Sequence, residues 1–235
     1  MKLHRFIGSF DLSQNRIESA DPELVHQIAD VLRLKAGEMC ILGDGALHEA
    51  LCEVAEISKK RVVFTAQEHR VNENEPKRSV ILHCAMLKRE NFEWAVQKAV
   101  ETGVKEIVPI RTMRTVKLET KEDRIKKIIK EAAEQSGRGV VPLLRLPILF
   151  KEAISAARSN KLNIVFDRSG SDFHTLSLPG DGLVGVFIGP EGGWHEDEVA
   201  LAREHKFDVA SLGPLTLRAE TAAIVASYLA THEIF

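Results

Sequence analysis

The first seventy residues carry short apolar stretches of the kind that form β-strands. The clearest of them cover residues 38–42, 47–54 and 61–66. A single helix interrupts these strands, because Asp21 supplies an N-cap acceptor and Pro22 occupies the first turn before residues 23–32. Several short strands with one helix predict a small β-barrel or sandwich.

A strand-helix alternation follows residues 71–78, which are polar, contain a proline and are the best linker candidate. Apolar runs predict buried parallel strands at 79–86, 105–110, 163–167, 183–189 and 208–213. Helical spacing, or position after a strand, predicts helices at 90–102, 119–136, 195–205 and 218–232. We therefore predict two domains, residues 1–72 and residues 73–235, the second with an α/β fold and a mostly parallel sheet.

The composition is that of a globular protein with no overall charge bias. Of 235 residues, 44% are hydrophobic and 28% are charged, and the formal net charge is −2, which excludes a strongly basic tail. A nucleic-acid partner is compatible with this charge, because a local patch can bind phosphate. From Arg111 to Arg138 there are nine Lys or Arg and five Asp or Glu, a local charge of +4. A solvated helix face gives the same pattern.

The cysteines and histidines point away from disulfides and metals. Cys40, Cys52 and Cys84 form no C-x-x-C pair, and no two histidines have the spacing of metal ligands. We therefore expect buried free thiols and no metal site. No apolar run approaches the roughly 18 residues of a membrane span, and no apolar signal core is present at the N-terminus. We expect a soluble cytoplasmic protein without a membrane partner.

The strongest local signal is IGPEGGW at residues 188–194, between a predicted strand and a helix with an acidic first turn. Ligands of open α/β sheets bind beyond the carboxyl ends of strands, and glycines let a ligand approach the backbone closely. The segment is neither a P-loop nor a dinucleotide fingerprint. Acidic residues at the helix start favour a neutral or cationic ligand. Glycines that serve only a tight turn are the alternative interpretation.

A second segment of the same kind is LGPLTLRAETA at residues 212–222. It also follows a predicted strand and enters a helix, with Arg218 and Glu220 at the helix start. A capping arrangement would explain these two residues on their own. Adjacent parallel strands would bring both glycine loops to the same edge of the sheet, so together they predict a ligand site.

Taken in order, these segments resemble the SPOUT-type RNA methyltransferases and, more narrowly, the ribosomal RNA small subunit methyltransferase E family. The two glycine segments carry the resemblance most specifically. Weaker matches in the correct order are His4-Arg5-Phe6, residues 26–37, Lys98 with residues 101–104, and residues 133–138 with Pro142. Thr102 replaces the usual leucine of its motif, and residues 111–118 depart from the arginine-serine pattern of many relatives.

The resemblance implies a PUA-like RNA-binding β-barrel over residues 1–72 and a SPOUT-type methyltransferase domain with a C-terminal trefoil knot over residues 73–235. It implies a homodimer that uses S-adenosylmethionine to methylate N3 of a uridine in 16S ribosomal RNA, as naked RNA or within the 30S particle. Physical rules alone would not predict a knot, because threaded connections are nearly absent from proteins. A non-catalytic RNA-binding or ribosome-assembly factor and a related methyltransferase acting on tRNA or on a ribose hydroxyl stay open as alternatives.

The resemblance also suggests roles for individual residues. Arg218 is the expected catalytic residue, which would stabilise negative charge on the uridine base, and Glu220 is a weaker candidate for the general base. Cofactor contacts are expected from Gly189, Glu191, Gly192, Gly193, Leu212, Gly213, Leu217 and Arg218. Contacts to RNA are expected from Arg5, Arg33, Lys88, Arg89, Arg114 and Arg138.

Overall fold

The computed structural model describes residues 3–115 and 121–232, which form two compact units. The first unit combines Met1–Glu75 with Ala133–Val141, and the second combines Pro76–Ala132 with Pro142–Phe235. The sequence pattern predicts that residues 73–235 form one domain, whereas in the structure Ala133–Val141 belongs with the first unit. The start of the predicted helix, residues 119 and 120, and residues 116–118 of the divergent motif lie outside the described residues.

The first unit is built on a sheet with the strand order β1-β3-β4-β5-β2. These strands are β1 (His4–Ile7), β2 (Arg16–Ser19), β3 (Met39–Gly43), β4 (His48–Ile57) and β5 (Val62–Val71). β1 pairs with β3 in parallel, and the other neighbours are antiparallel. The helix α1 (Pro22–His26) continues into a π-helical turn, η1 (Gln27–Val31). The Asp21 carboxylate accepts a hydrogen bond of 2.9 Å from the Glu23 N–H, so the predicted helix cap is confirmed.

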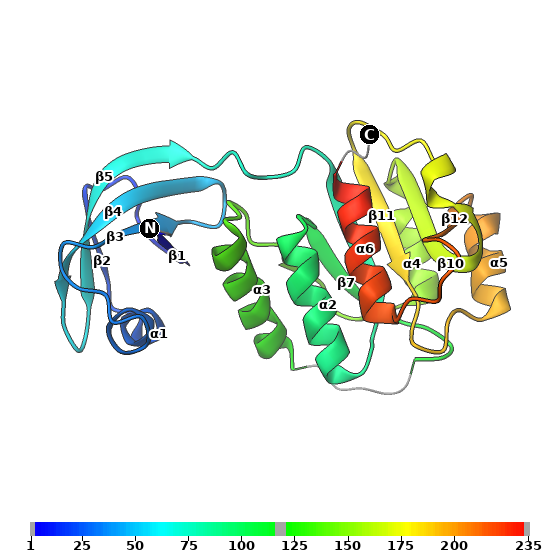
Figure 1. Cartoon of the computed structure of the whole chain (residues 1–235), viewed down its shortest axis with the longest axis horizontal. Coiled ribbons are helices and arrows are strands. Elements are labelled where there is room, and N and C mark those ends of the chain that lie inside the picture. The colour runs from blue at the N-terminus through cyan, green and yellow to red at the C-terminus, as the bar shows by residue number, and fades with distance from the viewer. Residues whose placement is uncertain (1–2, 116–120, 233–235) are drawn as a thin grey trace. The chain divides into compact units, whose positions relative to one another are not determined.

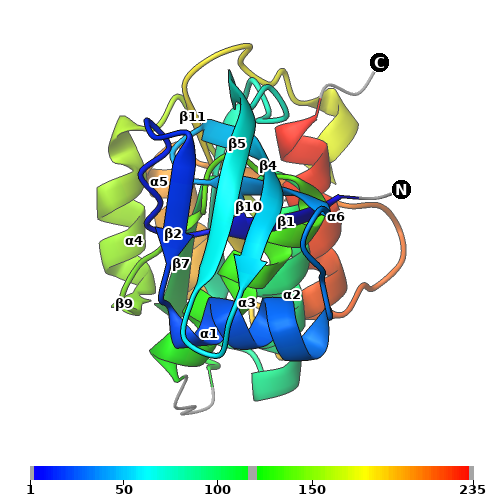
Figure 2. The same ribbon diagram turned by 90° about the vertical axis from the view of Figure 1, so that its left-hand side faces the viewer.

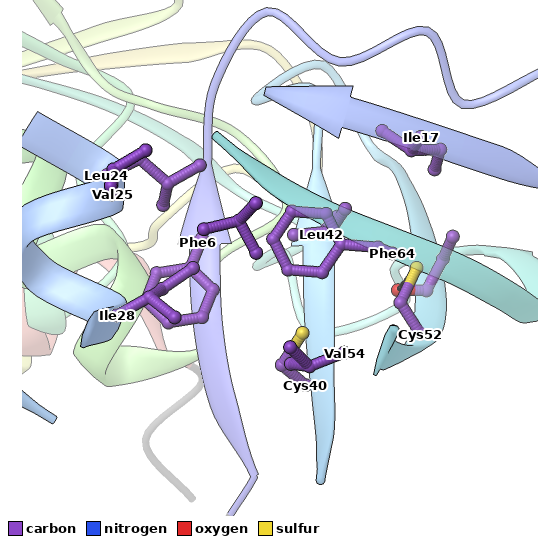
Figure 3. Close-up of a cluster of buried hydrophobic side chains, with 12 residues drawn as sticks. Phe6, Ile17, Leu24, Val25, Ile28, Cys40, Leu42, Cys52, Val54 and Phe64 are labelled. Atoms are coloured by element: carbon purple, nitrogen blue, oxygen red, sulfur yellow. Dashed lines mark hydrogen bonds between the residues drawn. The ribbon is translucent and has the colours of Figure 1, made fainter. Parts of the chain in front are cut away.

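Apolar side chains from the helical segment and the strands form the core of the first unit. Phe6, Phe64 and Ile28 are fully buried in it, and Figure 3 shows Ile28 packed beside Phe6. Cys40 and Cys52 lie in the same core as free thiols. Burial raises the pKa of Cys40 to about 12 and that of Cys52 to about 11, so both thiols stay protonated and act as small apolar groups.

Polar contacts attach the segment Ala133–Val141 to the rest of the first unit. The Glu134 carboxylate accepts a 2.8 Å hydrogen bond from the Ile7 N–H, and the Gly137 carbonyl accepts one of 3.1 Å from the Asn72 amide. Glu75 binds the Arg138 guanidinium through two oxygens, at 2.9 Å and 2.7 Å. These bonds join residues more than sixty positions apart in sequence, which explains why no local pattern reveals them.

The second unit is built on a parallel sheet with the order β12-β10-β11-β6-β7-β8, and β9 also pairs with β7. These strands are β6 (Ser79–Ala85), β7 (Glu106–Arg111), β8 (Leu143–Leu144), β9 (Ile148–Leu149), β10 (Leu162–Asp172), β11 (Leu183–Ile188) and β12 (Asp208–Ser211). All pairings among these described strands are parallel, as predicted. The sequence pattern predicts five of these strands but not the two-residue strands β8 and β9.

Helices cover both faces of this sheet. α2 (Arg89–Glu101) and α6 (Ala219–Thr231) pack together on one face, whereas α4 (Phe150–Ala156) and α5 (Glu196–Glu204) lie on the other, as Figures 1 and 2 show. The 3₁₀ turns η2 (Ala157–Ser159) and η3 (Phe173–Thr175) follow α4 and β10, and α3 (Glu122–Ser136) ends in the first unit. The carboxyl ends of the parallel strands share one edge of the sheet, which is the edge where such folds bind ligands.

Candidate active site

The two glycine loops form one cavity at the carboxyl edge of the second unit's sheet. The first loop follows β11, the second follows β12, and the cavity between them measures about 630 Å³. The lining includes every residue predicted to contact a cofactor, namely Gly189, Glu191, Gly192, Gly193, Leu212, Gly213, Leu217 and Arg218. A cavity of this size is typical of small-molecule and cofactor sites.

The first loop has a shape that only small residues allow. A Cβ at Gly189 would lie 3.0 Å from the Trp194 ring, which is itself fixed because its Nε1–H donates a 2.9 Å hydrogen bond to the Phe166 carbonyl. Gly193 has a φ of +70°, a left-handed conformation that other residues adopt at a cost. Its N–H bonds the Pro190 carbonyl at 2.8 Å and closes the turn. The glycines therefore bring the loop backbone to the cavity wall.

Neighbouring segments hold the first loop in place. The Lys88 N–H donates to the Glu191 carboxylate at 3.0 Å, and Arg114 Nη1 donates to the Gly192 carbonyl at 2.8 Å. The buried Glu198 carboxylate accepts from the N–H groups of Met113 and His195, each at 2.9 Å. The loops after β6, β7 and β11 are thus joined at one edge of the sheet.

The second loop is bound to a residue of β10. Gly213 has a φ of +113°, and the Ser211 hydroxyl donates to its carbonyl at 3.0 Å. Arg168 Nη1 donates to the Thr216 hydroxyl at 2.8 Å. Asp167 and Arg168 line the cavity but are absent from the predicted site. A signal for them exists in the sequence, since two charged residues follow the buried run 163–166 directly.

Arg218 and Glu220 line the same cavity but differ in their exposure to solvent. Arg218 is the N-cap residue of α6 and is exposed, and its guanidinium has no hydrogen bond or ion pair within residues 3–115 and 121–232. Glu220 is 2% exposed, and one of its carboxylate oxygens has no hydrogen-bond partner in that part of the chain. A buried acceptor without a partner is costly, so this oxygen is suited to a ligand that donates a hydrogen bond or carries positive charge.

The predicted RNA-binding cations fall into two groups. In the second unit, Lys88 and Arg114 are exposed around the first loop, and Arg89 is next to Lys88 and bonds Glu93 at 3.2 Å. In the first unit, Arg33 is exposed with a φ of +54°.

Arg5 and Arg138 are held inside the first unit instead. Arg138 is 4% exposed and bound to Glu75, and Arg5 is bound to the buried Glu49. Burial alone would raise the pKa of Glu49, but hydrogen bonds from Arg5, Asn72 and Arg70 lower it, so this carboxylate stays charged. Carboxylates of the same unit thus already pair with Arg5 and Arg138, and the expected contact of these two residues with RNA stays a prediction.

The described residues contain no group of three or more His, Cys, Asp or Glu side chains that could hold a metal ion. None of the helices in the described ranges is long and apolar enough to span a bilayer.

Comparisons with known proteins agree with this geometry. A family described as RNA methyltransferase domain matches residues 73–231, and one described as RNA methyltransferase PUA domain matches residues 21–67. The ribosomal RNA small subunit methyltransferase E of Bacillus subtilis is 32% identical, and the match covers 92% of each chain. The corresponding Rickettsia conorii protein is 29% identical over 96% of this chain and 94% of its own.

Two solved structures share the fold along almost the whole chain. One is a ribosomal RNA small subunit methyltransferase E from Neisseria gonorrhoeae bound to S-adenosylmethionine, with a TM-score of 0.89, 27% identity and coverage of 96% of this chain and 95% of the other. Another is a methyltransferase from Legionella pneumophila in complex with the same cofactor, with a TM-score of 0.88, 30% identity and coverage of 98% and 97%. The chain belongs to the ribosomal RNA small subunit methyltransferase E family.

Proposed function

We propose that this protein methylates N3 of a uridine in small-subunit ribosomal RNA, with S-adenosylmethionine as the methyl donor. The observation that carries the proposal is the single cavity formed by the two glycine loops, whose lining includes all the residues predicted to contact the cofactor. Membership of the family and two similar structures with bound S-adenosylmethionine support it.

The cavity suits this cofactor in shape and in charge. When bound, S-adenosylmethionine supplies an electrophilic methyl group on a cationic sulfonium. Backbone groups of Gly189–Gly193 and Leu212–Leu217 would hold its adenosyl part, because the glycines leave the loop backbone open to a ligand. The buried Glu220 oxygen would accept a hydrogen bond from the cofactor or oppose its positive charge.

Arg218 is the residue that we propose for catalysis. Uridine N3 carries a proton at neutral pH, so the site must favour the deprotonated base, whose negative charge spreads onto O2 and O4. The Arg218 guanidinium, which has no partner among the residues that the structure describes, lies on the wall of the cofactor cavity and can donate to these oxygens as the charge develops. Glu220 is the second candidate, as the general base that accepts the N3 proton.

The two family domains would divide the work between them. We propose that residues 1–72 bind RNA and that residues 73–235 bind the cofactor and the target base. Lys88, Arg89, Arg114 and Arg33 would contact phosphates, whereas Arg5 and Arg138 would shape the first unit from inside. The trefoil knot in residues 73–235 stays a prediction.

We further propose a homodimer formed through the face that carries α2 and α6. Tyr228 on α6 is 53% exposed and Trp94 on α2 is 49% exposed, although these helices pack against each other. α6 also carries small residues that permit close packing against a second helix.

An enzyme with this substrate acts in the cytoplasm, where ribosomal subunits are assembled.

The decisive experiment is labelled methyl transfer from S-adenosylmethionine to small ribosomal subunits that lack the modification, followed by nucleoside analysis. We expect 3-methyluridine as the product. Label in a different nucleoside, or label in tRNA alone, would support a related methyltransferase instead. RNA binding without transfer to subunits, naked rRNA or tRNA would support a non-catalytic assembly factor.

A further inference from the structure

A second cavity lies in the same unit, beyond the carboxyl end of β7. It measures about 330 Å³, and its walls come from the end of β6, from α2 and α3, and from the segment around β8 and β9. Its floor is apolar and includes Met86, Phe92 and Ile125, while Leu146 at 68% exposure contributes an apolar rim. The cofactor cavity does not use these residues.

Two cations of this cavity are exposed and without partners. Arg111 ends β7 and Lys121 precedes α3, and neither side chain has a hydrogen bond or ion pair within the described ranges. The other charges of the lining are already paired, because Glu122 binds Lys126 at 2.6 Å and Arg145 binds Glu106 at 2.7 Å. The cavity therefore offers two positive charges beside an apolar floor.

This cavity lies close to the cofactor cavity. Met86 lines the second cavity and Lys88 the first, so these linings approach within two residues, at most about 7 Å along the chain. The chain that follows Arg111 at the end of β7 leads to Arg114, which binds the Gly192 carbonyl of the first glycine loop. The linings of the two cavities are thus close neighbours along the chain.

We propose that the second cavity is a subsite for a nucleotide next to the target uridine, with its base on the apolar floor and its phosphate bound by Arg111 and Lys121. The proposal rests on the proposed methylation of RNA and names a further part of that substrate's site. Proteins recognise single-stranded RNA by combining base contacts of this kind with cationic contacts to the backbone. The pairing of an apolar floor with unpartnered cations is the chemistry that a nucleotide requires.

The test compares two double variants that each remove two positive charges. Arg111→Gln with Lys121→Gln changes the subsite, and Lys105→Gln with Lys206→Gln is the control, because these exposed lysines precede β7 and β12 at the opposite edge of the sheet. RNA affinity is measured at several salt concentrations with an unmodified rRNA fragment, and S-adenosylmethionine affinity is measured by calorimetry.

For the subsite variant we expect weaker RNA binding, a raised KM for RNA and unchanged cofactor affinity. The slope of log K against log salt should fall by roughly 0.7, since the variant loses its contact with one single-stranded phosphate and each such phosphate accounts for about 0.7. The charge-retaining variant Arg111→Lys with Lys121→Arg should keep the wild-type slope. Leu146→Glu, which adds negative charge at the rim, should weaken RNA binding without altering cofactor affinity.

Three results would overturn the subsite. They are an unchanged RNA affinity and salt slope in the glutamine variant, an equal loss in the control variant, and an equal loss in the charge-retaining variant. Methyl transfer by the wild-type protein distinguishes failure of the subsite from failure of the proposed function. If the wild-type protein transfers methyl groups and the variants have no effect, the subsite alone is refuted. If the wild-type protein binds RNA but transfers no methyl group, catalysis is refuted and the comparison of RNA binding remains valid.

Discussion

Arg218 and Glu220 are two positions apart, yet one guanidinium is exposed and one carboxylate is buried in the same cavity wall. Their positions explain the difference, because Arg218 has an extended backbone at the N-cap, outside α6, whereas Glu220 lies in the first turn of the helix. The exposed cation can follow a substrate, whereas the buried anion is fixed. This division gives Arg218 the stronger case for a contact with the base and Glu220 the stronger case for a fixed part of the cofactor wall.

At the scale of one residue, we predict that Arg218→Ala lowers kcat for methyl transfer by about 10²–10³, the usual effect of removing one donor to a developing negative charge. Cofactor affinity should change little, because the loop backbones remain. Single-turnover transfer and calorimetry with S-adenosylmethionine measure the two effects, and Arg218→Lys should recover part of the rate. A large loss of cofactor affinity with normal turnover at saturation would assign Arg218 to cofactor binding alone.

The sequence predicts that the two glycine loops lie at the same cavity, but it does not reveal the other residues of the cavity wall or the partners of the buried cations. Gly189–Gly193 and Leu212–Leu217 form local patterns after strands, so their common location follows from the parallel sheet alone. Asp167 and Arg168 reach the cavity only because β10 lies between β11 and β12. The partners of Arg5 and Arg138 are 44 and 63 positions away in sequence. Over such separations, the sequence around an arginine does not show whether its side chain is paired with a carboxylate or exposed to solvent.

At the scale of elements, β6 carries a buried group that links stability to pH. The His83 ring stacks on Phe187 with centroids 4.1 Å apart, and neither ring nitrogen has a hydrogen-bond partner in the described residues. Burial lowers the pKa of His83 to about 3, so the ring is neutral in the folded protein. The unfolded chain takes up a proton at this residue below about pH 6.5, whereas the folded chain does not.

We therefore predict that this histidine makes stability fall as the pH falls. Its contribution is complete above about pH 6.5 and is lost towards pH 3, at up to about 1.4 kcal/mol per pH unit. His83→Phe, which preserves a ring against Phe187, should have a flatter dependence of the free energy of unfolding on pH. Urea unfolding between pH 7 and pH 5 measures both proteins, and identical pH dependence would contradict the prediction.

The attachment of Ala133–Val141 also belongs to this scale. Arg138→Gln removes the guanidinium donors from the partly buried Glu75 carboxylate, and we predict a loss of about 1.5–3 kcal/mol in the free energy of unfolding. The matched control is Arg16→Gln, which breaks the exposed 3.1 Å pair of Arg16 with Glu56 and should cost at most about 1 kcal/mol. Urea unfolding compares them, and equal losses would show that burial of the Arg138 pair is irrelevant.

Elements were predictable where their pattern is long. The helices α2, α3, α5 and α6 match their predicted ranges to within a few residues. Apolar spacing over ten or more positions predicts α2 and α3, and position after a strand predicts α5 and α6. β8, β9 and α4 lie in a stretch for which nothing was predicted. Strands of two residues have no periodicity to detect, and they exist because β7 offers them an edge.

At the scale of the whole molecule, the proposed homodimer makes a direct prediction. Light scattering should give twice the mass of the chain, and Tyr228→Arg should shift the mass towards that of one chain, because the new charge would be buried at the interface. Leu143→Arg is a suitable control, since Leu143 is 47% exposed on β8, whereas α6 packs on β6 and β11. A wild-type monomer at micromolar concentration would refute the dimer.

The composition of the first unit from two separated stretches of chain affects how the protein can be made. While the protein is being synthesised, Ile7, Asn72 and Glu75 leave the ribosome long before Glu134, Gly137 and Arg138, to which they will bond. The amino-terminal sheet can form its contacts with Ala133–Val141 only after residues 76–132 of the second unit have been synthesised. A gene fragment that stops near residue 75 encodes the first unit without Ala133–Val141, so recombination cannot transfer this unit as one contiguous piece of the gene.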